Sequence, residues 1–296
     1  MFRRPAFAAL PLFMAVAVGV CATAASAAPS GGGTDAAGGR AGPKRYVDMV
    51  FTDTSMATDV VYAEAPSLVT GSPVPLHLDV VQPAGDKQRR RPAIVWVHGG
   101  GFRGGTKDMT TPMATDYARR GYVSFSIDYR LDPNRSSLAA KILAAQHDAQ
   151  AAVRWVRAHA STYGVDGSKI AIAGFSAGAI TALNVAYRSD DPGDVGDVDG
   201  TDSRVQAALA ASGCVYEPST IGAGDPPVFL LHADGDRAVP FACAQDVVTR
   251  AGDAGLVAET MFFSGEATHA RSLYLKYQAQ VDAAWTAFLV ARLRLT

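Results

Sequence analysis

The chain has 296 residues and a formal net charge of −1, with 27 basic and 28 acidic side chains. Hydrophobic residues make up 48% and charged residues 19%, which is the composition of a globular protein and excludes a disordered one. The balanced charge gives no basic patch for nucleic acid, and three cysteines are too few for a disulfide-rich scaffold or a four-cysteine zinc cluster. The length suits one large α/β domain or two small ones.

Residues 1–27 have the pattern of a secretory signal peptide. Two arginines near the start precede an apolar run over 7–20, too short to span a bilayer, and the small-residue sequence Ala25-Ser26-Ala27 provides a cleavage site. The pattern predicts export to the extracellular space or the cell envelope, with no stable membrane insertion after cleavage. A lipoprotein modified at Cys21 and an uncleaved anchor are the alternatives.

The folded domain is predicted to begin near residue 45. Residues 28–44 are rich in glycine and alanine and cannot bury a core, which indicates a flexible linker before a catalytic domain over 45–296. Val74–Val81 alternates between apolar and polar residues and is predicted to be a strand. The short runs Val47–Phe51 and Val60–Tyr62 are candidates to pair with it in antiparallel fashion.

Strands and helices alternate from residue 93 onward. The continuous apolar run Ala93–Val97 is typical of a strand covered on both faces. In Leu138–Tyr163 the apolar positions recur at three- and four-residue steps, which predicts a helix ending at Gly164. The alternation predicts an α/β fold with a mostly parallel central sheet and helices on both faces, and ligands bind such sheets at the C-terminal ends of the strands. The other predicted strands are 122–129, 169–174, 205–211, 228–232 and 258–263, and the other predicted helices are 111–120, 177–187, 242–251 and 274–293.

The motif Gly174-Phe175-Ser176-Ala177-Gly178 follows one predicted strand and opens a helix. Gly-x-Ser-x-Gly in this position is typical of a nucleophilic serine on a tight, strained turn, where small neighbours let the backbones approach. The N-terminus of the helix favours the negative charge that develops there. In a glycine-rich chain the motif also fits a plain turn, so the prediction of Ser176 as a nucleophile depends on its position and on the motifs below.

A second motif, His98-Gly99-Gly100-Gly101-Phe102, directly follows another predicted strand. Glycines expose backbone N–H groups, and acyl transfer needs such donors for the charge that builds on the carbonyl oxygen. We expect the N–H groups of Gly100 and Gly101, together with that of Ala177, to form this oxyanion hole. A phosphate-binding loop is the alternative, but its Gly-Lys-Ser/Thr ending and the Rossmann glycine spacing are absent.

An aspartate and a histidine follow the last two predicted strands. A serine hydroxyl needs an imidazole to accept its proton and a carboxylate to orient that imidazole. Ser176, Asp236 and His269 occur in the chain order of the α/β-hydrolase fold. Asp234 also lies past the end of its strand and is the alternative carboxylate.

Four features together resemble the carboxylesterase and hormone-sensitive-lipase-like group of secreted α/β-hydrolases. They are the two glycine motifs, Asp128-Tyr129-Arg130-Leu131, and an Asp-x-x-Val-Pro string before a late histidine, and the similarity covers roughly residues 70–296. The resemblance implies Ser176 as nucleophile, His269 as general base and then acid, and Asp236 as the carboxylate, because its spacing to Val-Pro matches the acid of the family. It implies hydrolysis of a carboxylic ester through an acyl-enzyme, with no cofactor.

The loops of the predicted sheet bear on the substrate. About fifteen residues separate the predicted strands that end near 211 and begin near 228, where lipases of this fold often carry a helical lid. The missing lid favours short-chain or aromatic acyl esters, and the family implies acetyl or feruloyl esters of plant polysaccharides, or simple carboxylic esters. A serine peptidase or amidase with the same residues is the alternative function, and a non-catalytic binding protein is a third. The candidate pocket-lining residues, each of which also fits the core, are Phe102, Tyr129, Tyr216 and Phe241.

Cys214 and Cys243 remain after signal cleavage and are predicted to form a disulfide, with two buried free thiols as the alternative. The aspartate-rich stretch 190–202 is predicted to be a solvated loop, because its spacing fails the EF-hand pattern for calcium. No histidine lies in a cluster with metal-ligand spacing, so no metal is expected. The other histidines are expected to be structural or exposed: His98 bracing the glycine loop, His232 capping its strand, and His77, His147 and His159.

Overall fold

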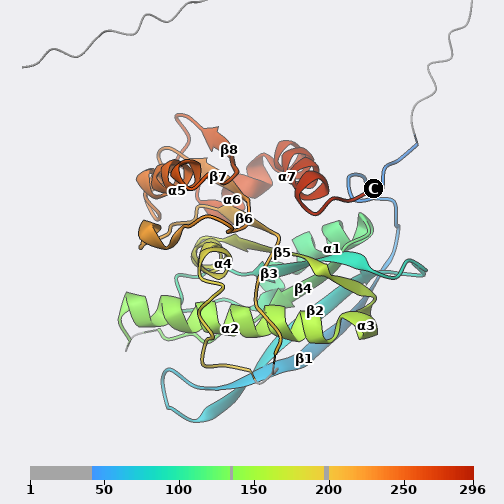
Figure 1. Ribbon diagram of the computed structural model, residues 1–296, viewed down its shortest axis with the longest axis horizontal. Coiled ribbons are helices and arrows are strands. Elements are labelled where there is room, and N and C mark those ends of the chain that lie inside the picture. The colour runs from blue at the N-terminus through green and yellow to red at the C-terminus, as the bar shows by residue number, and fades with distance from the viewer. Residues whose placement is uncertain (1–41, 134–135, 197–199) are drawn as a thin grey trace, which may run out of the picture. The chain divides into compact units, whose positions relative to one another are not determined.

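The computed structural model describes residues 42–133, 136–196 and 200–296. The predicted signal peptide with Cys21, most of the predicted linker, and two aspartates of the 190–202 stretch lie outside the described residues. Within the described part, one compact unit starts at Gly42 and is built on an eight-stranded sheet of order β1-β2-β4-β3-β5-β6-β7-β8 (Figure 1).

Strands and helices alternate along the chain from β3 onward, as the apolar pattern predicts. The strands are β1 (Thr54–Pro66), β2 (Pro73–Pro83), β3 (Arg91–Val97), β4 (Val123–Ile127), β5 (Val165–Phe175), β6 (Ala207–Ala211), β7 (Val228–Ala233) and β8 (Ala258–Phe263). The helices are α1 (Thr111–Arg119), α2 (Leu138–Ala158), α3 (Ala160–Tyr163), α4 (Ala177–Tyr187), α5 (Phe241–Asp253), α6 (Ala270–Lys276) and α7 (Gln278–Arg292), with 3-10 turns η1 (Lys107–Met109) and η2 (Pro218–Thr220).

The sheet is mostly parallel, which confirms the predicted α/β-hydrolase fold. β2 runs antiparallel to both of its neighbours, β1 and β4, whereas every pair from β4 through β3 and β5 to β8 is parallel. In the register of the central strands, Val97 of β3 lies opposite Gly174 of β5, and Phe175 lies opposite Ala211 of β6. The segments that follow β3, β5 and β6 therefore leave the sheet side by side.

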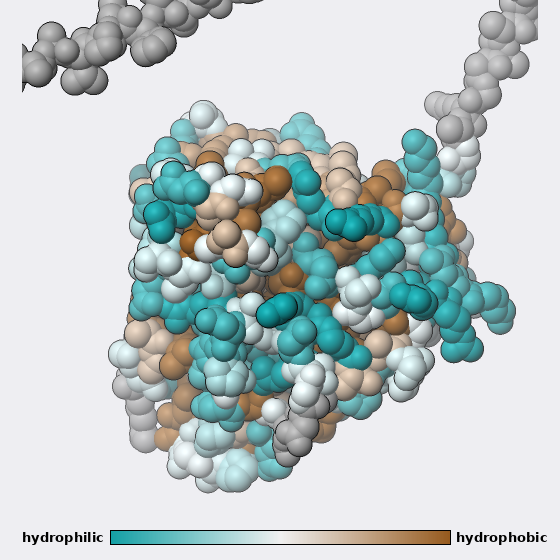
Figure 2. Space-filling model, viewed as in Figure 1, coloured by the Kyte–Doolittle hydropathy of each residue, from teal (hydrophilic) through white to brown (hydrophobic). Residues whose placement is uncertain are grey.

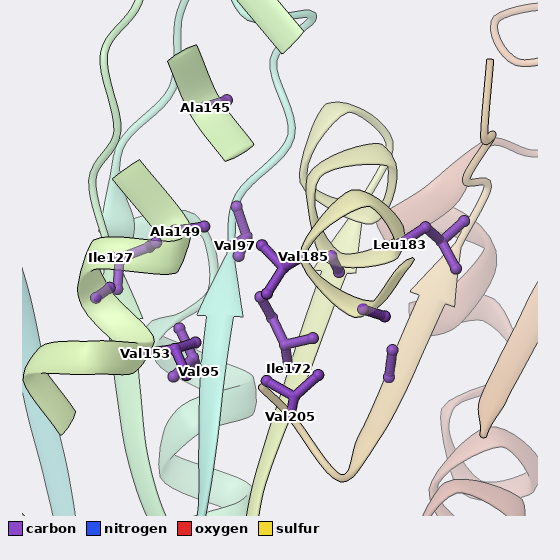
Figure 3. Close-up of a cluster of buried hydrophobic side chains, with 14 of the residues drawn as sticks. Val95, Val97, Ile127, Ala145, Ala149, Val153, Ile172, Leu183, Val185 and Val205 are labelled. Atoms are coloured by element: carbon purple, nitrogen blue, oxygen red, sulfur yellow. The ribbon is translucent and has the colours of Figure 1, made fainter. Parts of the chain in front are cut away.

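Two hydrophobic layers cover the faces of the sheet. Side chains alternate along β3, so that Val95 and Val97 face one layer and Ile94 and Trp96 face the other, and all four are fully buried. The first layer contains residues of α2, α4 and α5, and the second contains residues of α1, α6 and α7. Figure 3 shows the first layer, where α2 and α4 pack their small and branched side chains against β3 and β5. This burial is the main stabilising term of the fold.

Three predicted elements differ from the structure. Val47–Phe51 is not a strand: the N–H groups of Val50 and Phe51 both donate to the carbonyl of Arg119, at the end of α1. The predicted helix 138–163 breaks at His159, and the predicted helix 274–293 breaks at Tyr277, where the backbone leaves the helical range. The apolar period continues across both breaks, which is why periodicity alone does not detect them.

The face of the unit that Figure 2 draws is mainly polar. Figure 2 shows hydrophilic residues over most of the visible face, with smaller apolar patches between them. Among the residues that the structure describes, none of the helices combines the length and the apolar character that crossing a bilayer requires.

Arg130 joins the aspartate-rich loop to α2. Its N–H and Nε donate to Asp148 of α2 at 2.6 and 2.9 Å, and both residues are buried. Arg130 Nη2 also lies 3.2 Å from Asp194, whose carboxylate is 2.7 Å from His147 Nδ1. The described aspartates of this loop include several held by basic side chains of α2, and no metal-binding group of His, Cys, Asp or Glu occurs among the described residues.

We predict that Asp148→Ala lowers the free energy of unfolding by about 3–5 kcal/mol, because it leaves the Arg130 guanidinium buried without its main partner. The measurement is urea unfolding followed by circular dichroism. The exposed pair Arg250–Asp253, at 3.6 Å, provides the control, and Asp253→Ala is expected to cost less than about 1 kcal/mol. Equal effects of the two substitutions would show that the Arg130–Asp148 pair does not hold the loop.

Candidate active site

Ser176 lies on the sharp turn between β5 and α4. Its backbone is in an unusual conformation, φ 56° and ψ −120°, and its N–H donates to the carbonyl of Ala211 at 2.9 Å. The flanking glycines permit this turn: a Cβ added to Gly178 would lie 2.1 Å from the Val97 carbonyl oxygen, and one added to Gly174 would lie 2.1 Å from the Gly178 oxygen. Glycine is therefore required at both ends of the motif, because the backbone passes other backbone atoms there too closely for a side chain.

The structure brings Ser176, His269 and Asp236 together. His269 Nε2 lies 2.7 Å from Ser176 Oγ, and His269 Nδ1 lies 2.7 Å from Asp236 Oδ2. Asp236 follows β7, and His269 lies between β8 and α6, so three loops at the same edge of the sheet supply the three groups. This chain of hydrogen bonds can draw the proton from the serine hydroxyl to the imidazole.

The Asp236 carboxylate is held by a full set of donors. Its side chain is completely buried, and the N–H groups of Ala238 and Val239 donate to Oδ1 at 2.9 and 3.2 Å. Burial alone would raise its pKa, but the hydrogen bonds from His269, from the Ser212 hydroxyl and from these amides lower it below the usual value. The carboxylate is therefore ionised at neutral pH and can orient the imidazole.

Asp234, the alternative carboxylate, lies elsewhere. It is exposed, and its Oδ1 accepts a hydrogen bond of 2.9 Å from the N–H of Gly265. That contact links the loop after β7 to the loop after β8 and does not involve the imidazole of His269, which contacts Asp236 instead. In the structure Asp236, the predicted carboxylate, contacts the imidazole, and Asp234 does not.

The glycine loop after β3 packs directly on this serine turn. A Cβ added to Gly99 would lie 2.9 Å from the Phe175 carbonyl oxygen and 3.3 Å from Ser176 Cβ. Gly100 and Gly101 have φ of 117° and 63°, in the region that favours glycine, and both are exposed. Ala177 is the first residue of α4, where the N–H groups have no partner within the helix. Backbone N–H groups without a partner at a helix N-terminus can donate hydrogen bonds to an anion.

The buried His98 side chain supports the glycine loop. Its Nδ1 lies 2.6 Å from the Gly99 carbonyl oxygen, and burial lowers its pKa, which keeps the ring neutral. Tyr129 stacks on the imidazole with ring centroids 4.3 Å apart and donates its hydroxyl to the His98 carbonyl at 3.0 Å. Phe102 packs edge-on against Tyr129.

The four candidate pocket residues divide into two groups. Phe102 and Tyr129 are 2% and 3% exposed and form part of the core under the glycine loop, so the prediction that they line a substrate pocket is corrected. Their aromatic rings pack under the glycine loop and support it, and do not face the solvent. Phe241 is half-buried against Phe262 and His232. Tyr216 is 53% exposed and lines a groove of about 360 Å³ between α2, α4 and the segment after β6.

A disulfide joins Cys214, in the segment after β6, to Cys243, in the first turn of α5. It closes a loop with a sequence separation of 29 residues that contains β7 and Asp236. The loop carrying the carboxylate is therefore anchored at both ends, on one side by the sheet and on the other by a covalent bond.

Ser212 is the site residue that the motifs do not identify. It is fully buried, directly follows β6, and hydrogen bonds to both Asp236 and the N–H of Ala270. The available signal is weak: a polar residue comes directly after a buried apolar strand, as Ser176 also does. One serine in that position does not define a motif.

Comparisons with known proteins agree with this fold. A sequence model of the family described as BD-FAE matches residues 78–215. The chain is 28% identical over 258 residues to the probable carboxylic ester hydrolase LipM of Mycobacterium tuberculosis, covering 74% of this chain and 56% of LipM. It is also 28% identical over 232 residues to the esterase LipQ of that organism, covering 66% of this chain and 54% of LipQ. The chain thus spans about half the length of these two relatives.

A solved structure extends the comparison to nearly the whole of a related chain. Thermogutta terrifontis esterase 2, phosphorylated by paraoxon, matches with a TM-score of 0.67 and 26% sequence identity, covering 80% of this chain and 94% of the esterase. A truncated carbohydrate esterase from gut microbiota matches with a TM-score of 0.68 at 19% identity, covering 83% of this chain and 98% of that chain, and this likeness concerns the fold alone.

We predict that Asp236→Asn lowers kcat for an ester by about 10⁴-fold while the protein remains folded, because the amide no longer holds the imidazole in the orientation and protonation state that the reaction needs. The measurement is steady-state hydrolysis of an activated ester. Asp234→Asn is the matched control, since its amide oxygen can keep the bond from Gly265, and it is expected to leave kcat unchanged. The reverse pattern would assign the carboxylate to Asp234.

Replacing Cys214 and Cys243 together by serine is expected to lower the free energy of unfolding by roughly 3–4 kcal/mol, since the unfolded chain regains the freedom of a loop of 29 residues. Chemical denaturation of the variant and the wild type measures the difference. Alkylation under denaturing, non-reducing conditions gives an independent check, because neither cysteine should be labelled in the wild type. Labelling of both would contradict the disulfide.

Proposed function

We propose that this chain, an α/β-hydrolase of the carboxylesterase and hormone-sensitive-lipase-like group, is an exported serine hydrolase of carboxylic esters. The observation that carries the proposal is the pair of 2.7 Å contacts that link Ser176 through His269 to a buried, ionised Asp236. The glycine loop that packs on this serine turn supports the proposal, because exposed backbone N–H groups can stabilise an oxyanion. The ester hydrolase names of LipM and LipQ support the same reaction class. The N-terminal sequence supports export.

In the acylation step, Ser176 Oγ attacks the carbonyl carbon of the ester while His269 Nε2 accepts the hydroxyl proton. The carbonyl oxygen becomes negatively charged and is stabilised by the N–H groups of Gly100, Gly101 and Ala177. When the tetrahedral intermediate collapses, the imidazolium gives its proton to the departing alcohol. An ester between the acyl group and Ser176 remains.

In the deacylation step, a water molecule takes the place of the alcohol. His269 Nε2 accepts a proton from this water as its oxygen bonds to the acyl carbon, and the same three N–H groups stabilise the second oxyanion. The proton then returns to Ser176 Oγ, and the carboxylic acid leaves. Asp236 stabilises the imidazolium in both steps and is not itself protonated.

The surroundings of the serine support small or flat acyl groups as substrates. The segment 212–227, between β6 and β7, contains only the short turn η2 and no helical lid. Gly100 and Gly101 are exposed, and the His269 side chain is 31% exposed. An open site of this kind suits short-chain or aromatic acyl esters, including acetyl or feruloyl esters of plant polysaccharides.

We predict that the protein hydrolyses p-nitrophenyl acetate and that Ser176→Ala lowers kcat by more than about 10⁴-fold, because the acyl-enzyme can no longer form. The release of p-nitrophenolate is followed in an absorbance assay. Circular dichroism of the variant controls for folding. Wild-type protein that is folded but inactive on this ester, or a Ser176→Ala variant that is fully active, would contradict the proposal.

The same assay on acetyl, butyryl and octanoyl esters tests the substrate class. The expected order is a kcat/KM that falls as the acyl chain lengthens, since the segment between β6 and β7 carries no helical lid that could cover a long chain. A maximum at the octanoyl ester would contradict the short-chain preference while leaving ester hydrolysis intact.

A further inference from the structure

The end of β6 contacts all three loops of the candidate triad. The carbonyl of Ala211, its last residue, accepts the N–H of Ser176 at 2.9 Å. Ser212, the next residue, donates its N–H to Leu231 of β7 at 2.8 Å, so it is also fixed to the strand that leads to Asp236.

The Ser212 hydroxyl joins the acid loop to the histidine loop. Its oxygen accepts the N–H of Ala270, the residue after His269, at 2.9 Å. Its hydrogen bond to Asp236 lowers the pKa of that carboxylate. A hydroxyl has one donor and two acceptor positions, so a single side chain can make both contacts at once. Since Ser212 is fully buried, water does not compete for either contact.

The backbone of Ser212 is strained. Its φ is +54°, in the left-handed region that non-glycine residues seldom adopt, and Ala270 has φ +45°. A serine at such a position costs free energy that a glycine would avoid. The backbone conformation alone would favour glycine at this position. The two hydrogen bonds of the hydroxyl, to Asp236 and to the Ala270 N–H, explain why serine is present instead.

We propose that Ser212 is a positioning residue of this site, whose hydroxyl fixes the Asp236 carboxylate and the backbone after His269 relative to each other. The proposal rests on the proposed esterase function. Ser212 does not touch the serine oxygen or an ester; it acts through Asp236 and His269, and keeps the imidazole at hydrogen-bond distance from Ser176 Oγ. Small displacements of a reacting group of about 1 Å can lower a rate by about 10²-fold.

Two substitutions separate the hydroxyl from the backbone conformation. Ser212→Ala removes the hydroxyl and keeps the strain, whereas Ser212→Gly removes both. We expect kcat for p-nitrophenyl acetate to fall by about 10- to 100-fold in each variant, with KM nearly unchanged, because the loss concerns the orientation of the base and not the binding of substrate. The rate of inactivation by paraoxon is expected to fall in parallel, since phosphorylation uses the same serine and base.

A matched control is Ser124→Ala. Ser124 is also a fully buried serine in the sheet, and its hydroxyl accepts a hydrogen bond from Trp96 Nε1 at 3.3 Å, within β4 and away from the triad. This variant is expected to lose stability and to keep the wild-type kcat. Thermal unfolding of all three variants shows whether a change in kcat follows a change in stability.

The outcomes separate this proposal from the esterase proposal. A wild-type protein without turnover contradicts the esterase function itself. An active wild type with a Ser212→Gly variant of equal kcat would overturn the positioning role, since glycine then replaces serine without loss. A Ser212→Gly variant that does not fold would overturn it as well, because the hydroxyl would then serve the fold.

Discussion

The geometry of the site depends on the hydrogen-bonded register that holds β5 between β3 and β6. Val97 lies opposite Gly174, and Phe175 lies opposite Ala211, so the segments that follow these strands emerge at the same edge. Their approach is so close that a Cβ on Gly178 would lie 2.1 Å from the Val97 oxygen. A shift of this register would separate the oxyanion donors from the serine. Gly99, Gly174 and Gly178 are thus required by the packing of backbones before they are required by the chemistry.

The loops at the same edge of the sheet also stabilise a buried charge, the Asp236 carboxylate. An ionised carboxylate without partners is expensive in a protein interior. Asp236 is buried, yet two amides, a hydroxyl and an imidazole donate to it, and its pKa is lowered. The negative charge is therefore available to orient and stabilise a cation on His269. A second imidazole, that of His232, has its Nε2 3.6 Å from the same carboxylate, but burial lowers the pKa of His232 and keeps it neutral.

Much of this arrangement could be predicted from the sequence, because the informative residues come directly after apolar runs. Buried parallel strands are continuous in apolar residues, and their C-terminal ends meet, so Ser176, Gly100, Gly101, Asp236 and His269 could be placed near one another without coordinates. Residue types alone do not decide between Asp234 and Asp236, since both follow the same strand, and the family resemblance favours Asp236 by its spacing to Val239-Pro240. In the structure, Asp236 contacts His269 and Asp234 contacts Gly265.

The sequence predicts neither the burial of two aromatic residues, nor a helix break, nor the role of Ser212, and each has its own physical cause. Phe102 and Tyr129 adjoin the motifs, but their side chains are buried. Tyr129 stacks on His98 and so supports the glycine loop, and it does not line a substrate pocket. The helix break at His159 lies within a continuous apolar period, which carries no information on a local change of backbone angles. Ser212 contributes through a strained backbone angle and two hydrogen bonds, and neither is visible in the identity of one serine.

The proposed function depends above all on Ser176 being a nucleophile activated by His269 and Asp236. Its most direct test is mass spectrometry of the protein after treatment with paraoxon, which transfers its phosphoryl group to an activated serine and releases p-nitrophenolate. We predict one covalent adduct per chain, on the peptide that contains Ser176, forming far more slowly in Asp236→Asn. An adduct on a different residue, or ester turnover that continues in protein left unmodified at Ser176, would contradict it.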